Sequence, residues 1–321
     1  NTTGASNTAL GYGALSANTT ADNNTAVGLN ALLVNTTGYD NVAVGRASLD
    51  ANTDGHSNTA VGESSLTSNT TGVRNVAIGQ NAMAVSTTGG ENIAIGRGAL
   101  DANTTASRNV AVGDSALGAN TTAQSNTAVG WSALAANTTG DQNTAVGAYA
   151  LDANTTGTRN HAFGVEALTA CTTGDNNTAL GHTALAALTT GSTNVSVGYN
   201  SGSAITTGTK NCILGVDAGN QITTASGNTA MGFDALTRCT IGGNNTCFGH
   251  GAGDNISTGS SNTMIGLDAG STINQGDNNI CVGNDAKCAG GQSQNEIVIG
   301  VGINGVGSNS FSFGKASNVV S

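Results

Sequence analysis

The sequence predicts an all-β fold, a parallel β-solenoid in which every coil is one 17-residue repeat. Asn recurs in unbroken steps of 17 from Asn7 to Asn279, and Gly follows the same steps from Gly11 to Gly283. The chain has 48 Gly and no Pro, so every backbone N–H is available for a strand ladder. Only 9% of residues are charged and 3% are aromatic, which disfavours both a highly charged disordered chain and a conventional core of large side chains.

The first element of each repeat is predicted to be a short strand. Numbered from the leading Asn, the consensus is N-[TV]-A-[VIL]-G-x-x-A-L-x-A-N-T-T-G-x-x. Ala at position 3 faces one way, and positions 2 and 4 face the other. Gly at position 5 ends the strand where a side chain would block a bend or a neighbouring backbone. We expect the position 1 residues to form a stacked amide ladder that satisfies the backbone at a bend. The predicted ladder comprises Asn7, Asn24, Asn41, Asn58, Asn75, Asn92, Asn109, Asn126 and Asn143, and the predicted glycine turns comprise Gly11, Gly28, Gly45, Gly62 and Gly79.

A second segment, at positions 8, 9 and 11 (Ala14, Leu15 and Ala17 in the first full repeat), is predicted to supply the opposite wall, and positions 12 to 15 the return turn. In four later repeats Leu at position 9 becomes Gly, and position 12 changes from Asn to Ile, as in the pair Gly202 and Ile205. Such an exchange indicates that both positions share one interior volume, because a packed interior tolerates swaps that conserve volume. The repeat with Leu185 and Leu188 does not follow this rule. The predicted core residues are Val27, Leu32, Val44, Leu100, Leu134, Ile205 and Ile222.

The regular array is predicted to span residues 1–289, followed by a cap or transition segment at 290–321. The interval from Asn279 to Asn295 is 16 instead of 17, and Gly290-Gly291 interrupts the pattern. Each coil supplies only about two large aliphatic side chains, so its Ala face gains most if another chain closes over it. This favours a homotrimer, with a monomeric solenoid as the alternative.

Two stretches of the sequence resemble known families. N-[TV]-A-[VI]-G with a small-residue turn resembles the heads of trimeric autotransporter adhesins, the YadA-like left-handed parallel β-roll, over residues 1–289. The longer form A-L-x-A-N-T-T-G resembles phage and large-virus tail-fibre repeats that precede an endosialidase-type intramolecular chaperone. The segments NEIVIG at 295–300 and GSNSFSFG at 307–314 are similar to the region just before such a chaperone. The repeat is longer than the adhesin units usually are, and the stalk, membrane anchor and chaperone are absent from the sequence.

The resemblance implies a structural fibre, either the shaft or the head of a trimeric viral tail fibre that attaches to a host surface. Its expected location is extracellular or on the virion surface, as part of a tail fibre. Its expected partners are further copies of itself and a cell-surface receptor, with glycan as the default receptor class. The alternative is a bacterial surface adhesin or a self-assembling extracellular filament. Seventeen coils at about 4.8 Å each would give a rod of roughly 80 Å, and three copies would present each weak contact three times. The sequence does not identify the receptor-binding residues.

Several function classes are disfavoured. The net charge of -10 and the scattered basic residues argue against a nucleic-acid partner, and no apolar run is long enough for membrane insertion. No acid, base and nucleophile converge, so we expect neither an enzyme nor a bound cofactor or metal. Asp50, Asp101 and Asp152 recur at every third coil, about 14 Å apart, too far for a glycosidase pair. The Thr row at position 13 raises an ice-binding hypothesis, but hydroxyl-capped turns account for it better.

Three further expectations concern single columns of the repeat. The six Cys are expected to be buried thiols, because those that share a column, such as Cys171 and Cys239, lie several coils apart. Asn-Thr-Thr triplets such as the one at Asn18 match the glycosylation motif, but later Ile in the same column predicts burial and no modification. Arg74, Glu91 and Arg108 at position 17 predict a ladder of alternating charge.

Overall fold

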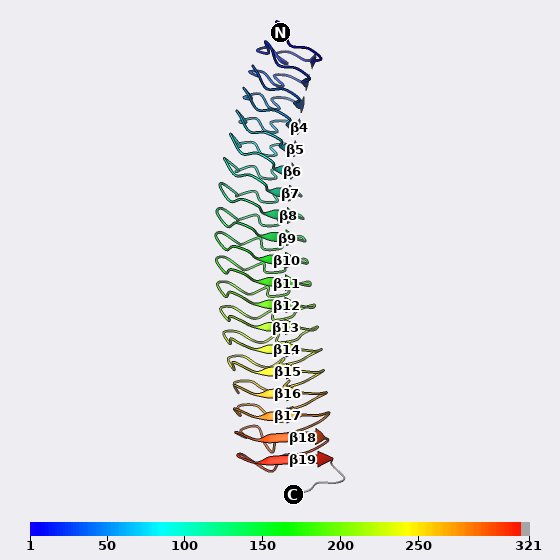
Figure 1. The fold of residues 1–321 in the computed structure, drawn as a ribbon, viewed down its shortest axis with the longest axis vertical. Helices are drawn as coiled ribbons and strands as arrows, with labels where there is room; N and C mark the ends of the chain where they lie inside the picture. Colours follow the sequence, from blue (N-terminus) through cyan, green and yellow to red (C-terminus); the bar gives the residue numbers. More distant parts are fainter. Residues whose placement is uncertain (316–321) are drawn as a thin grey trace. The chain divides into compact units, whose positions relative to one another are not determined.

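The computed structural model describes residues 1–315 and confirms a parallel β-solenoid with one coil per 17-residue repeat. The chain divides into two compact units, Asn1–Arg159 and Asn160–Ser321. In each unit every coil contributes one short strand, which pairs in parallel with the strand of the next coil (Figure 1). Thr25 pairs with Val42 and Val195 with Cys212, so the register is one full repeat. The described residues contain no helix.

Unit 1 contains β1 (Thr8–Leu10), β2 (Thr25–Val27), β3 (Val42–Val44), β4 (Thr59–Val61), β5 (Val76–Ile78), β6 (Ile93–Ile95), β7 (Val110–Val112), β8 (Thr127–Val129) and β9 (Thr144–Val146). Unit 2 contains β10 (His161–Phe163), β11 (Thr178–Leu180), β12 (Val195–Val197), β13 (Cys212–Leu214), β14 (Thr229–Met231), β15 (Thr246–Phe248), β16 (Thr263–Ile265), β17 (Ile280–Val282), β18 (Ile297–Val301) and β19 (Phe311–Lys315).

The alternation within each strand decides which residues enter the core. In β2 to β9 the middle residue is buried, whereas the first and third residues are half-buried or exposed. Ala26 and Ala43 have no exposed surface, because the opposite wall of their own chain covers them. The expectation that the Ala face gains most when another chain closes over it is therefore wrong. Val27 and Val44 lie on the outward side and are only half-buried, so their assignment to the core is wrong as well.

Leucine at position 9 forms the main interior column. Leu32, Leu100 and Leu134 are fully buried, as predicted, and so are Ile205 and Ile222. Position 8 is buried beside it in most coils. Position 11 is not, since Ala17 is half-buried and Val34 is 39% exposed. The opposite wall thus consists of positions 8 and 9, and position 11 turns outward.

The exchange between positions 9 and 12 is visible at three of the four glycines, whereas Met264 lies nearest to Gly270. A Cβ built on Gly202 would lie 3.0 Å from Ile205 Cδ1, and one on Gly219 would lie 2.9 Å from Ile222 Cδ1. The isoleucine therefore occupies the space next to the missing leucine. Position 3, the middle residue of the strand, also takes part in the exchange, and the pattern of positions 9 and 12 alone did not indicate this. The middle strand residue is Ala in the coils of β2 to β11 and β14, which keep Leu or Met, but in the four Gly coils it is Ser196, Ile213, Cys247 or Met264.

The coil that carries both Leu185 and Leu188 depends on its successor. Both side chains are fully buried. The next coil has Gly202 in the leucine column, and a Cβ there would lie 3.2 Å from Leu185 Cδ2. Leu185 therefore extends into room that the following coil leaves open.

Besides the strand-ending Gly, three residues in each regular coil take up positive φ and turn the chain. They occupy positions 7, 9 and 17, as Asn30 (φ 59), Leu32 (φ 49) and Asp40 (φ 55) do in the second coil. A bulky residue such as Leu rarely adopts this region. Burial of the side chain in the leucine column offsets that backbone strain, which is of order 1–2 kcal/mol.

The strand ladder continues past the boundary predicted near residue 290. Glu296 takes the position of the ladder Asn, its N–H donating to Asn279 Oδ1 at 3.0 Å, and Ile280 pairs with Ile297 at the usual spacing of 17. The repeat shortens one coil later, where Ile297 pairs with Phe311, 14 residues on. Residues 316–321 of the predicted cap lie outside the described residues.

Candidate functional site

The position 1 asparagines form the predicted ladder inside each unit. The backbone N–H of Asn41 donates to Asn24 Oδ1 at 3.0 Å, and Asn41 Nδ2 donates to the carbonyl of Gly55 at 2.9 Å. Asn58 repeats both bonds with Asn41 and Gly72. These amides therefore link their own coils to the adjacent coils. Asn126 is an exception within the ladder, since its N–H and Oδ1 are paired but its buried Nδ2 has no partner among the described residues. Beyond the half-buried Asn7, the ladder residues from Asn24 to Asn143 are fully buried.

A second buried amide row runs at position 12 of unit 1. Asn35 Nδ2 donates to Asn18 Oδ1 at 3.2 Å and to the carbonyl of Gly38 at 2.8 Å. The sequence analysis assigned this position to a turn, although the later Ile in the same column was the signal for burial. Asn18, Asn69, Asn103 and Asn137 are at most 1% exposed, so the expected burial of these glycosylation motifs is confirmed.

The strand-ending glycines permit a close approach between coils. A Cβ on Gly28 would lie 2.4 Å from the carbonyl oxygen of Gly45, and one on Gly45 would lie 2.4 Å from that of Gly62. A Cβ on Gly11 or Gly79 would likewise clash with the carbonyl oxygen of the glycine in the next coil. All of these glycines have φ between 132° and 138°. These glycines are structural, as predicted.

The outward residues of the strands form a surface without formal charge. We call the first and third residues of β2 to β9 in unit 1, and of β10 to β18 in unit 2, the outer strand face. The chain has 9 Lys and Arg and 19 Asp and Glu, yet none of them lies on this face. Instead it carries Thr, Val, Ile, Leu and Phe, together with His161, Cys212 and Met231. Ile95 is 37% exposed in unit 1 and Phe248 is 52% exposed in unit 2. The third residues of these strands are all apolar, and a partly exposed apolar row of this kind is typical of an interaction site in soluble proteins.

Position 6, directly after the strand-ending Gly, borders the outer strand face and differs between the units. In unit 1 it includes two ion pairs between successive coils, Arg46 with Glu63 and Arg97 with Asp114. A hydrogen bond from the Ser115 hydroxyl and the Arg97 guanidinium lower the pKa of Asp114. In unit 2 the same column carries exposed apolar and aromatic residues, with His182 stacked on Tyr199 and Phe233 on His250.

The predicted charge ladder at position 17 forms only in part. Arg74 Nη1 contacts Glu91 Oε1 at 2.6 Å. Arg108 turns to the following coil, where its Nη2 donates to Gln124 Oε1 at 2.8 Å. A guanidinium on a long exposed side chain can reach acceptors in more than one coil. The repeat pattern at position 17 therefore did not predict the partner of Arg108.

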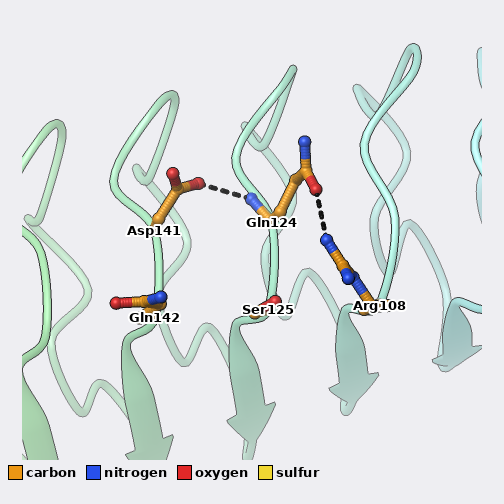
Figure 2. A pocket seen from close by; sticks show the side chains of 5 residues that line it. All are labelled: Arg108, Gln124, Ser125, Asp141 and Gln142. Atoms are coloured by element: carbon orange, nitrogen blue, oxygen red, sulfur yellow. Dashed lines mark hydrogen bonds between the residues drawn. The ribbon is translucent and has the colours of Figure 1, made fainter.

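A small open pocket lies next to this column in unit 1. It is lined by Arg108, Gln124, Ser125, Asp141 and Gln142 from three successive coils (Figure 2). The backbone N–H of Gln124 donates to Asp141 Oδ1 at 2.6 Å, which completes a chain of contacts from Arg108 to Asp141. Such a lining offers two amides, one hydroxyl, one cation and one carboxylate to a polar ligand.

The other candidate residues remain separated. Asp50 accepts a hydrogen bond from Thr67 Oγ1 at 2.6 Å, whereas burial raises the pKa of Asp101, three coils away. In residues 1–315 no group of three or more His, Cys, Asp or Glu side chains is placed to hold a metal ion. The same part of the chain contains no helix long and apolar enough to cross a membrane.

The position 13 hydroxyls are used within the fold. Thr36 Oγ1 donates to the carbonyl of Thr53 at 3.2 Å, and Thr189 Oγ1 donates to that of Thr206 at 3.1 Å. The hydroxyls thus cap the turn between coils, which favours that account over an ordered hydroxyl array facing ice.

The chain matches no known protein family and no curated protein sequence.

Proposed function

We propose that this chain is a structural and adhesive segment of an extracellular fibre, and that three copies associate through the outer strand face. The observation that carries the proposal is the lack of formal charge on that face in both units, although the chain has 28 charged residues (9 + 19) elsewhere. Val, Ile and Phe side chains there remain half-exposed in a single chain, and their burial would stabilise an oligomer by about 25 cal/mol per Å².

A homotrimer of a viral tail fibre is the assembly that we favour, supported by the repeat and by the 295–300 and 307–314 segments. In such a fibre the outer strand faces lie inside the assembly, and the turns carry the surface that meets the host. The polar pocket at Arg108 and Asp141 is the candidate contact for a polar receptor such as a glycan. Three copies would raise avidity without a strong individual site.

A single lysine in the outer strand face tests the assembly. Ile95→Lys places a cation in the proposed interface, whereas Thr88→Lys adds the same charge at an exposed turn position. We expect light scattering coupled to size exclusion to give a trimer for the native chain and for Thr88→Lys, and monomers for Ile95→Lys. A native chain that remains monomeric at micromolar concentrations would rule out the trimer.

Attachment is tested separately, on host cells and on immobilised glycans. We expect the trimer to bind and the Ile95→Lys monomer to bind at least tenfold more weakly, because avidity is lost. A trimer that binds neither surface would contradict the adhesive role and leave the assembly intact.

A further inference from the structure

Two cysteines of unit 2 lie in contact within a single coil. Cys281 is the middle residue of β17, and Cys288 follows seven residues later. Their Sγ atoms are 3.0 Å apart, and the two residues are 0% and 2% exposed. The comparison of columns between coils could not reveal this pair, because the two residues occupy different repeat positions of the same coil.

The other buried thiols have different surroundings. Cys171 and Cys239 direct their Sγ atoms to the carbonyls of Gly174 and Gly242 in their own turns. Burial raises the pKa of each of these thiols to about 11. They replace the position 12 Asn as small interior groups, which is the role the sequence predicts. Cys212 differs from that expectation, since it is exposed on the first position of β13.

We propose that Cys281 and Cys288 form an intramolecular disulfide that fastens β17 to the segment leading into the last coils. Their sulfurs lie about 1 Å further apart than the ~2.05 Å of the bond, so a small side-chain adjustment suffices. This disulfide is independent of the proposed fibre function. It lies just before the coil from β18 to β19, where the repeat shortens.

The oxidation requires an external disulfide, for which oxidised glutathione is the probe. The thiolate of one cysteine attacks a glutathione sulfur, a mixed disulfide forms, and one glutathione thiolate leaves. The second cysteine then attacks the protein sulfur of the mixed disulfide and releases the other glutathione. In total the two protein thiols lose two electrons and two protons, and oxidised glutathione gains them as two thiols.

The surroundings of Cys288 indicate when the bond forms. Its hydrogen bond with Cys281, burial and the nearby Glu296 all raise the pKa of the Cys288 thiol. The Glu296 carboxylate is fixed there by the N–H groups of Ala289 and Gly307, at 3.0 and 2.9 Å. Since the thiolate is the reacting species, exchange is slow once the coil has closed. The disulfide should therefore form during folding.

The cross-link would strengthen a region where the regular ladder changes. The segment between the two cysteines contains Lys287, which bridges to Asn304 outside the named strands, and the coil from β18 to β19 is shorter than the others. Closing the loop limits local opening of these coils, because the opened state loses conformational freedom. Backbone amides of 280–305 should then exchange more slowly in the oxidised protein.

The experiment compares chains refolded with reduced and oxidised glutathione against chains refolded in excess reductant. Cys212→Ser serves as the background for all samples, because it removes the exposed thiol. After denaturation and alkylation, five thiols should react in the reduced protein (6 − 1) and three in the oxidised protein (5 − 2). Peptide masses should locate the missing label at Cys281 and Cys288.

Alanine variants separate the cross-link from packing. Ala occurs in the column of Cys288, for example Ala135, and it is the usual residue in the column of Cys281 where the coil keeps Leu or Met. The coil of Cys281 has Lys287 at the Leu position, so Cys281→Ala also removes core volume, and each variant is therefore compared in its oxidised and reduced forms. Oxidation should raise the thermal midpoint of the parent by a few degrees, and this difference should vanish in both variants. It should persist in Cys247→Ala, which removes another buried thiol of the same column. Five alkylated thiols after oxidative refolding, or a bond between other cysteines, would overturn the proposal.

Discussion

At the scale of single residues, the repeat is maintained by backbone constraints that only some side chains satisfy. The ladder Asn serves as donor and acceptor at once, so neither Asp nor Leu can replace both functions. The strand-ending Gly is required for space. The glycine at position 7, such as Gly98, is favoured mainly by backbone conformation, since Ser, Asp and Asn stand there in other coils. The glycines at position 9 differ, because they also leave room for the neighbouring Ile. The strand-ending and position 7 glycines predict different mutational costs.

Substituting one glycine of each kind tests this distinction. In Gly45→Ala the new Cβ would lie 2.4 Å from the Gly62 carbonyl oxygen, so the coils must separate. In Gly98→Ala the nearest atom is 3.9 Å away and only the φ of +63° is unfavourable. We expect Gly98→Ala to lower the free energy of unfolding by about 1 kcal/mol and Gly45→Ala by more than about 3 kcal/mol. Denaturant titrations of both variants provide the measurement, and equal losses would contradict the argument.

A carboxylate in the position 10 column gives a pH-dependent prediction. Burial raises the pKa of Asp101, so the charged form is disfavoured in the folded chain. The folded state then binds more protons than the unfolded state around that pKa, and stability falls as the pH rises through it. Asp101→Asn should therefore raise the thermal midpoint at neutral pH. The gain should disappear below about pH 4, where the unfolded carboxyl is also protonated. A gain of equal size at all pH values would assign the effect to something other than ionisation.

At the scale of a coil, the period, the ladder and the leucine column could be predicted from the sequence. The inward face of the strand could not, because the sequence pattern placed Val27 and Val44 in the core. Alternation separates Ala from Val or Ile, and hydrophobicity alone would bury the larger side. In the structure Ala is buried because the two walls of a coil lie close together. The distance between the walls cannot be derived from the residues of a single repeat. The outward position of Val27 and Val44 follows from this geometry.

The same argument explains why the polar pocket could not be predicted. Arg108, Gln124 and Asp141 come from three coils and from two repeat positions, so no column contains them together. Arg108 reaches this lining by bonding to Gln124 and not to Glu91.

The volume exchange predicts strong coupling within one coil. Gly219→Leu should clash with Ile222, whose Cδ1 would lie 2.9 Å from the new Cβ, and with Ile213. We expect a loss of about 3 kcal/mol in the free energy of unfolding. Adding Ile222→Cys and Ile213→Ala recreates the combination Ala230, Leu236 and Cys239 of the next coil. The triple variant should recover more than half of the loss, as measured by chemical unfolding. A loss in the triple variant equal to the sum of the three single losses would show that the positions are independent.

At the scale of the whole molecule, each unit is a succession of near-equivalent coils, and stability should be close to a sum over coils and their contacts. Deleting 58–74 removes 17 residues and joins Ser57 to Asn75, which restores the repeat order. In this variant the N–H of Asn75 replaces that of Asn58 as the donor to Asn41 Oδ1, and Gly79 replaces Gly62 as the residue that faces Gly45. The bonding groups are therefore unchanged. Deleting only 58–66 removes nine residues but leaves a coil without its strand and its leucine.

We expect the whole-coil deletion of 58–74 to shift the thermal midpoint by only a few degrees. The deletion of 58–66 should cause a far larger loss despite its smaller size, because it leaves ladder N–H groups without partners. Circular dichroism and thermal unfolding of both variants provide the comparison, and a whole-coil deletion as harmful as the partial one would contradict the equivalence of coils.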